Sequence, residues 1–135
     1  AELFRRVCLN VLGANNDDHT KNHSFLRTEE GDWSLSPAYD VTFAFNPDNQ
    51  WLRQHLMSVN GKFSRITAGD LLRLADQFDV PDARGILDQV RAAVGHWPEH
   101  ARAAGLSPER TQVVGSRLRE VESELELPPV IGLRG

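Results

Sequence analysis

The chain has 135 residues, of which 40% are hydrophobic and 25% charged, and its formal net charge is −4. This composition is typical of one globular domain with a single core, and no apolar run approaches the roughly 20 residues needed to cross a bilayer, which excludes a membrane-spanning protein. The negative charge also disfavours direct binding to nucleic acid, which normally requires a basic stripe.

The residue counts bear on the setting of the protein. Cys8 is the only cysteine, so no internal disulfide can form, and a reducing cytoplasm is the expected location. Its thiol lies between two apolar neighbours and is expected to pack as a small hydrophobic group. The chain opens with Ala1, and Met57 is its only methionine, so we expect it to be part of a longer protein.

The first predicted element is a helix of about three turns that ends at Gly13. Glycine suits a left-handed helix cap, and Gly13 is expected to adopt that conformation. The apolar residues of this helix recur at steps of three and four: Leu3, Phe4, Val7, Cys8 and Val11.

A polar run from Asn16 to Asn22 follows the helix. Asp17 and Asn22 are five positions apart, the interval at which a kinase catalytic loop places its base and its metal-binding amide. Asp40 supplies a further carboxylate downstream. The pattern is typical of a metal and phosphate site.

Two short β-prone runs at 23–27 and 33–36 flank a polar loop and predict an antiparallel hairpin. A hairpin returns the chain close to where it left, so Asp40 can approach Asn22 despite eighteen positions of separation. The two side chains can then share one ion.

The region between the hairpin and the helical half has weaker signals. The chain from Val41 to Gln54 shows no clear period and contains turn-forming residues, which predicts a loop. A second, smaller hairpin is predicted from strands at 56–59 and 63–66 around the dipeptide Asn60-Gly61.

From Thr67 onward the pattern is helical. Thr67 can cap a helix that runs to about Phe78, and Pro81-Asp82 starts another helix that Pro98 ends or kinks. The predicted apolar faces are Leu71, Leu72 and Ala75 in the first of these helices, and Ile86, Leu87, Val90 and Val94 in the second.

The last predicted helix starts at Ser107, a capping residue followed by proline, and ends at Pro128-Pro129. The acidic run 120–126 is interpreted as its solvated face. Its apolar residues are Val113, Val114, Leu118, Val121 and Leu125.

Together these elements predict a mainly α fold with a small antiparallel β-hairpin insert. We expect one domain over 1–135, with the candidate site in 1–66 and a helical part in 67–130.

Phosphoryl transfer needs a group that orients the attacking hydroxyl and accepts its proton, and magnesium ions that hold the triphosphate charge. A carboxylate suits the first task. Magnesium prefers oxygen ligands, so the carbonyl of Asn22 and the carboxylate of Asp40 are suitable holders.

Three linked motifs carry a resemblance: the run 16–22 with the preceding segment 10–13, the segment 35–41, and the segment 57–62 before a helix start. Together they resemble the carboxy-terminal half of HipA-type toxin kinases of bacterial toxin–antitoxin pairs. The resemblance covers about residues 1–130.

The resemblance implies a serine/threonine protein kinase with a two-lobed, kinase-like core, whose helical C-lobe this chain would form. By motif match Asp17 would be the catalytic base, and Asn22 and Asp40 would be ligands of Mg²⁺. Lys21 would touch the transferred phosphate of ATP, and His19 would brace the loop.

The sequence departs from a whole family member because it contains no Gly-rich loop and no nucleotide-pairing lysine on a strand. The chain alone is therefore expected to fold without phosphorylating anything. The family also implies a HipB-like helix-turn-helix antitoxin as partner, DNA contact only through that antitoxin, and a protein substrate such as an aminoacyl-tRNA synthetase.

Other interpretations of the same residues stay open. The chain could belong to a degenerate pseudokinase that binds an antitoxin, or to an unrelated helical interaction domain whose acidic loop is incidental. His19 and His23 could suggest a zinc pair, but no third nitrogen or sulfur ligand lies nearby in the sequence. Trp33 and Tyr39 are interpreted as packing residues, and the segment 96–100 as a helix break with a buried Trp.

Overall fold

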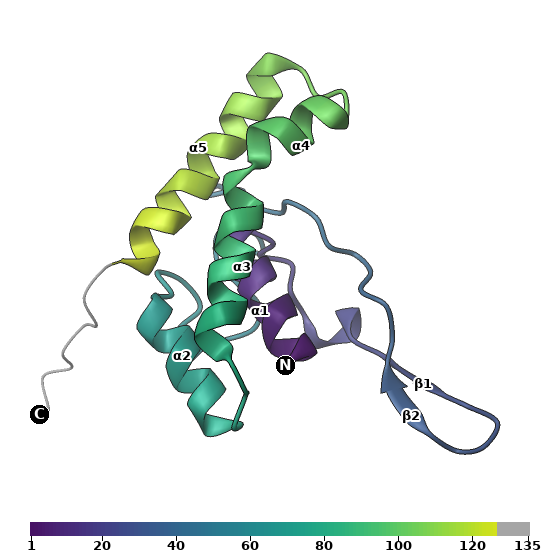
Figure 1. Ribbon diagram of the computed structural model, residues 1–135. Coiled ribbons are helices and arrows are strands. Elements are labelled where there is room, and N and C mark those ends of the chain that lie inside the picture. The colour runs from purple at the N-terminus through teal and green to yellow at the C-terminus, as the bar shows by residue number, and fades with distance from the viewer. Residues whose placement is uncertain (127–135) are drawn as a thin grey trace, which may run out of the picture.

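A computed structural model describes residues 1–126 of the chain (Figure 1). Within that range the fold is mainly helical with one antiparallel hairpin, which confirms the predicted fold class. None of its helices combines the length and the apolar character that a membrane span requires. The elements are α1 Glu2–Leu12, a 3₁₀ turn η1 Thr20–Asn22, β1 Phe25–Arg27, β2 Trp33–Leu35, α2 Ala68–Gln77, α3 Ala83–Gly95, α4 Trp97–Ala103 and α5 Pro108–Leu125.

Helix α1 supplies the centre of the core and packs against α3 and α5. Its buried side chains Phe4, Cys8, Val11 and Leu12 follow the spacing of a single helix face. Cys8 is fully buried, as predicted, and burial raises the pKa of its thiol to about 12.

The end of α1 differs from the prediction. Gly13 has φ −82°, which is not left-handed, and the left-handed residue is Ala14 with φ 50°. Glycine is needed at 13 for another reason, because a Cβ there would lie 2.8 Å from the carbonyl oxygen of Leu9. Close backbone approach, rather than a positive φ, selects this glycine.

The helical half begins where its capping residues predict. The side chain of Thr67 accepts from the amide of Asp70, and the Asp70 carboxylate accepts from the amide of Thr67, which completes a capping box on α2. Ser107 caps α5 in the same manner through the amide of Arg110. The predicted apolar face of α3 points inward, and so do Leu71 and Ala75 of α2, but Leu74 packs against the core in place of the predicted Leu72.

Three details of the last helices correct the sequence analysis. Pro98 lies in the first turn of α4, so the chain breaks after α3 and starts a further helix that was not predicted. Trp97 at this break is half-buried, and its indole N–H donates to the carbonyl of Thr111 at 2.9 Å. Val113 is 69% exposed and does not belong to the apolar face of α5. Pro128-Pro129 lies outside the described residues.

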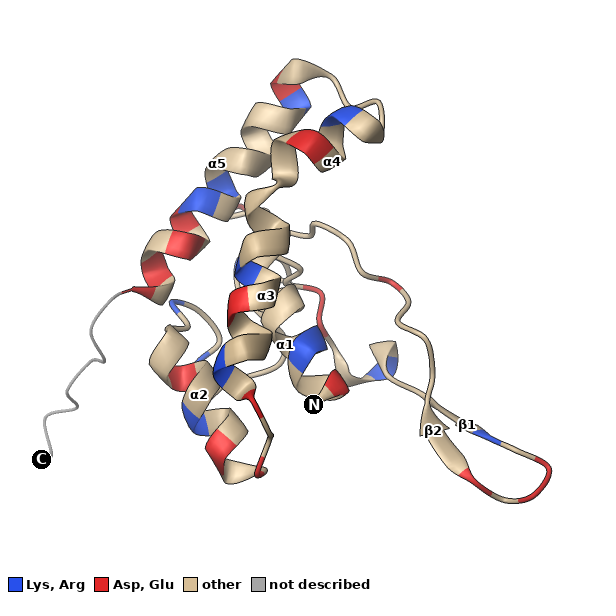
Figure 2. Ribbon diagram, in the orientation of Figure 1, with Lys and Arg blue, Asp and Glu red and all other residues tan. Residues whose placement is uncertain are grey.

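The acidic end of α5 is only partly a solvated face (Figure 2). Arg91 of α3 pairs with Glu122 and Glu126, which ties the two helices together. Arg117 pairs with Glu120 and Glu124 on the same helix. The structure therefore uses much of this charge for contacts on or between helices.

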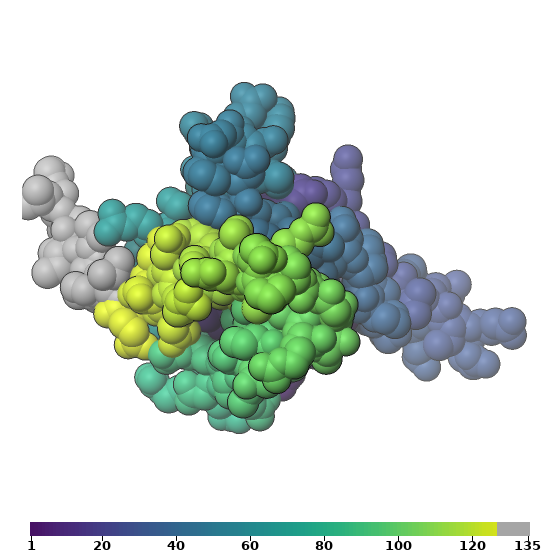
Figure 3. All heavy atoms as spheres, turned by 90° about the horizontal axis from the view of Figure 1, so that it is seen from above, coloured from purple at the N-terminus to yellow at the C-terminus, as the bar shows by residue number. Residues whose placement is uncertain are grey.

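The hairpin β1–β2 pairs Phe25 with Leu35 and Arg27 with Trp33, and it extends away from the helical body (Figures 1 and 3). The prediction that Trp33 and Tyr39 are packing residues is wrong, because their exposures are 67% and 41%. No helix among the described residues covers either face of this two-stranded sheet closely.

The second predicted hairpin forms only its turn. Asn60 and Gly61 have φ 51° and 76°, and Val59 exchanges two backbone hydrogen bonds with Lys62. The strands do not continue, because the amide of Met57, which would pair with Ser64 in this register, donates to the side chain of Asp18 instead. The preceding region, from Val41 to Gln54, contains no helix or strand, as predicted.

Candidate functional site

The candidate site begins in the loop that leaves α1. Side chains alternate along it, since Asn16 and Asp18 are buried while those of Asp17 and His19 are 45% and 37% exposed. Such alternation is what extended backbone produces, because successive side chains point to opposite sides. Asp17 and His19 therefore face the same way.

Buried asparagines fix the start of this loop. Asn15 forms an isolated β-bridge with Ala44, and its side-chain nitrogen donates to the side-chain oxygen of Asn10 at 3.0 Å. Asn16 donates from its backbone to Ala44 at 3.1 Å and from its side chain to the carbonyl of Leu52 at 2.9 Å. The loop is thus attached to α1 and to two later segments.

Asp18 is a functional candidate that sequence reasoning missed. Its carboxylate lies 2.9 Å from Nδ1 of His55 and accepts from the amides of Leu56 and Met57 at 2.8 and 3.1 Å. Both Asp18 and His55 are buried. Nothing in the local sequence distinguishes Asp18 from Asp17, because the partners of Asp18 are 37 to 39 positions away.

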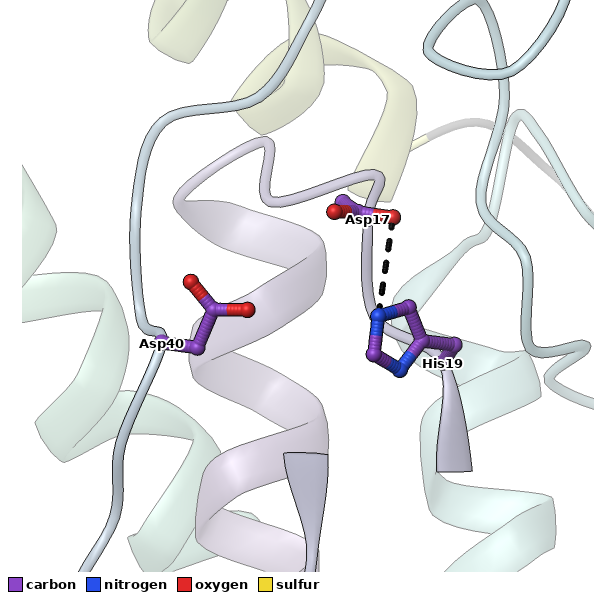
Figure 4. A group of neighbouring side chains, drawn as sticks. All are labelled: Asp17, His19 and Asp40. Carbon is purple, nitrogen blue, oxygen red and sulfur yellow. Dashed lines mark ion pairs between the residues drawn. The ribbon is translucent and has the colours of Figure 1, made fainter. Parts of the chain in front are cut away.

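The structure brings together three of the predicted site residues. Asp17, His19 and Asp40 each offer a ligand atom, and these atoms all lie within 4.8 Å of one another. Asp17 and His19 come from the loop after α1, whereas Asp40 comes from the segment after the hairpin and faces them (Figure 4). Nε2 of His19 lies 3.9 Å from the Asp17 carboxylate.

Asp40 has a backbone conformation that few residues adopt. Its φ is 53°, in the left-handed region, where aspartate and asparagine are the commonest residues after glycine. Its backbone carbonyl is 3.5 Å from the amide nitrogen of Asn15.

Asn22 is oriented by the turn in which it lies. Its backbone amide donates to His19 at 3.0 Å, and its side-chain nitrogen donates to the backbone carbonyl of Asp17 at 3.1 Å. Because the nitrogen is used in this way, the side-chain oxygen is the atom that can bind a cation.

The hairpin brings Asn22 and Asp40 to one place, as its out-and-back path predicts. Both residues line a cavity of about 30 Å³. The hydroxyl of Tyr39 donates to the carbonyl of Lys21 at 2.7 Å, which joins the two ends of the hairpin segment. Lys21 itself is exposed, and His23 lines the same cavity.

The donor set suits a hard divalent cation. It contains the carboxylates of Asp17 and Asp40, and Asn22, which lines the same cavity as Asp40, offers an amide oxygen; carboxylate and amide oxygens are ligands that Mg²⁺ prefers. The nearby imidazole of His19 adds one nitrogen. The residues at this site therefore fit magnesium.

The family model described as HipA-like C-terminal domain matches residues 1–97, which include the whole candidate site. No curated protein and no solved structure matches the chain.

Proposed function

Because the chain belongs to the family of HipA-like C-terminal domains, we propose that it is the catalytic lobe of a serine/threonine protein kinase of a toxin–antitoxin system. The reaction proposed is transfer of the γ-phosphate of ATP to a serine hydroxyl of a protein.

One observation carries the proposal: Asp17 and Asp40, from segments separated by the hairpin, meet with His19 within 4.8 Å. An acidic loop that only forms a solvated turn has no need of this convergence. The fixed amide of Asn22 points to the same conclusion.

In the proposed mechanism each residue has a separate task. Asp17 holds the hydroxyl of the substrate and receives its proton. The oxygens of Asn22 and Asp40 would hold Mg²⁺, which supplies neutralisation of phosphate charge when bound. His19 lies beside Asp17 and limits the positions of its carboxylate, and the exposed Lys21 is free to reach a phosphate.

We propose that the chain alone does not transfer phosphate. The 135 residues contain neither a Gly-rich phosphate loop nor the strand lysine that pairs with nucleotide phosphates in kinases. Incubation of the purified chain with radiolabelled ATP should therefore label no protein, and labelling would contradict this part of the proposal.

Metal binding tests the site directly. Asp40→Asn should weaken binding of Mn²⁺, used as a paramagnetic substitute for Mg²⁺, by at least about tenfold, because one of its charged ligands is lost. Asp48→Asn is the matched control, since Asp48 is exposed in a loop outside the site. Equal Mn²⁺ affinity in the wild type and Asp40→Asn would argue for a protein-binding module instead.

Catalysis is tested in a longer protein that joins this chain to a nucleotide-binding lobe. Asp17→Asn should lower kcat by roughly 10²- to 10⁴-fold, the usual contribution of a general base, with little change in the KM for ATP. Unchanged kcat would remove Asp17 from the mechanism.

The proposed partners rest on the family alone. They are a HipB-like helix-turn-helix antitoxin, DNA reached through that antitoxin, and a substrate in translation such as an aminoacyl-tRNA synthetase. Co-purification of the chain with a co-expressed antitoxin would test the first of these.

A further inference from the structure

We infer that Asp18 and His55 are positioning residues that hold Asp17 and His19 toward Asp40, an inference that rests on the proposed function of this site. Neither residue has a ligand atom in the cluster of Asp17, His19 and Asp40. Their effect on that cluster is exerted through the backbone of the loop.

The side chain of Asp18 and those of its two neighbours point in opposite directions. Asp18 lies between Asp17 and His19 in the chain and points inward, whereas both neighbours point outward. In extended backbone the two directions are coupled, so holding Asp18 inward holds Asp17 and His19 outward. A rotation of the loop that released Asp18 would turn both site residues away from Asp40.

Hydrogen bonds hold the Asp18 carboxylate in its buried position. A buried carboxylate is costly unless its oxygens are satisfied, and that of Asp18 has three partners. One oxygen accepts from the amides of Leu56 and Met57, and the other lies 2.9 Å from Nδ1 of His55. Charge-assisted hydrogen bonds of this kind define geometry more closely than neutral ones.

The hydrogen-bonded residues Asn16 and Asp18 lie on either side of Asp17 in the loop. Asn16 secures the chain immediately before Asp17 through Ala44 and Leu52, and Asp18 secures it immediately after. Asp17 is therefore held from both sides.

The experiment compares two buried aspartates in the full chain. Asp18→Asn keeps the volume of the side chain but removes its charge and leaves one oxygen, instead of two, to accept hydrogen bonds. Asp70→Asn is the matched control, since Asp70 is equally buried and extensively hydrogen-bonded but has its side-chain partners, within residues 1–126, at 60, 62 and 67. Thermal unfolding reports the stability of each variant, Mn²⁺ titration followed by NMR reports the site, and ¹⁵N relaxation reports the order of residues 17–22.

We expect Asp18→Asn to weaken Mn²⁺ binding by roughly tenfold, as outer-shell changes commonly do, and to increase the mobility of residues 17–22. Asp70→Asn should lower thermal stability but leave Mn²⁺ affinity and the mobility of residues 17–22 unchanged. The inference is overturned if folded Asp18→Asn keeps the wild-type affinity and loop order, or if Asp70→Asn changes them equally.

Two further outcomes are separable. If the wild-type chain binds no Mn²⁺, the metal-binding part of the proposed function fails, while the loop order of Asp18→Asn still decides this inference. If Asp18→Asn does not fold, His55→Gln decides it, because this variant leaves the two backbone amides on Asp18. A weakening of about threefold supports the inference, and unchanged loop order and affinity overturn it.

Discussion

Asp70 shows what a buried carboxylate does when it serves the fold and not the site. Burial alone raises its pKa, but hydrogen bonds from Lys62, Asn60 and Thr67 outweigh that effect and lower the pKa to about 2. Lys62 lies 2.8 Å away, so the charge is paired as well as hydrogen-bonded. Asp70 thus joins the turn at 60–61 to the start of α2.

This pKa predicts how stability depends on pH. A folded-state pKa of about 2, against an ordinary value of 3.8, means that ionised Asp70 contributes about 2 kcal/mol to the free energy of unfolding. The contribution is present above pH 4 and is lost as the pH falls toward 2. Urea unfolding between pH 7 and pH 2 should show this loss in the wild type and not in Asp70→Asn.

The control is Asp76→Asn, which changes an exposed carboxylate on the same helix. It should retain the pH dependence of the wild type. A pH profile of Asp70→Asn that parallels the wild type would show that other groups cause the acid transition.

Residues of the site differed in how far the sequence could predict them. Asp17, Asn22 and Asp40 could be predicted because their spacing along the chain matches a known chemical pattern. The structure brings Asp40 to both of the others. Their chemical roles remain predictions. Asp18 could not be predicted from the sequence, because its proposed role depends on His55. No periodicity or local spacing relates two residues that are 37 positions apart.

At the scale of elements, α2 ends in an unusual version of a common motif. The amide of Val80 donates to Ala75 at 3.0 Å and that of Asp79 to Asp76 at 3.3 Å, the two bonds of a Schellman motif. The left-handed residue of this motif is normally glycine, but here it is Asp79 with φ 49°. An acidic group also sits at the negative end of the helix dipole.

Asp79→Gly should therefore stabilise the protein by about 1 kcal/mol, because glycine relieves the left-handed strain and removes the unfavourable charge. The midpoint of urea unfolding measures the change. The control is Arg73→Gly, which places glycine at an exposed position in the middle of the same helix and should destabilise by about 1 kcal/mol. A lower stability of Asp79→Gly would contradict this expectation, because it would mean that contacts of the Asp79 side chain stabilise the fold by more than the left-handed strain destabilises it.

Elements with strong end signals were predicted best. The caps at Thr67 and Ser107 act within one turn of their helices, so local sequence contains the whole interaction. The second hairpin was predicted wrongly for the opposite reason, since a distant carboxylate, Asp18, accepts from the amide of Met57 that the hairpin would have used. Long-range competition for backbone donors cannot be seen in a local pattern.

At the scale of the whole molecule, the helical body and the hairpin differ in how they are supported. The body surrounds a core that includes the fully buried Cys8, Leu12 and Leu71. The hairpin exposes more than half of Phe25, Leu26 and Trp33. A two-stranded sheet without a covered face is only marginally stable.

Hydrogen exchange should separate the two parts. The amides paired between β1 and β2 should exchange by local opening, far faster than those in the middle of α1, which require global unfolding. NMR exchange rates measure both sets in one sample. Equal protection in the hairpin and in α1 would contradict this expectation.

Substitutions provide an independent check of the same contrast. Trp33→Ala should change the free energy of unfolding by less than about 0.5 kcal/mol, because the ring is largely exposed. Leu71→Ala should cost about 2 to 5 kcal/mol, because it leaves a cavity in the core.

The backbone of Asp40 also limits which amino acids can stand at that position. With φ 53°, glycine, asparagine and aspartate are the residues that adopt the conformation at low cost. Glycine lacks a ligand atom and asparagine lacks a charge, whereas glutamate retains the charge but not the backbone preference. Position 40 thus requires both a residue that adopts a positive φ at low cost and a side chain with a charged ligand atom. Aspartate is the amino acid that meets both requirements.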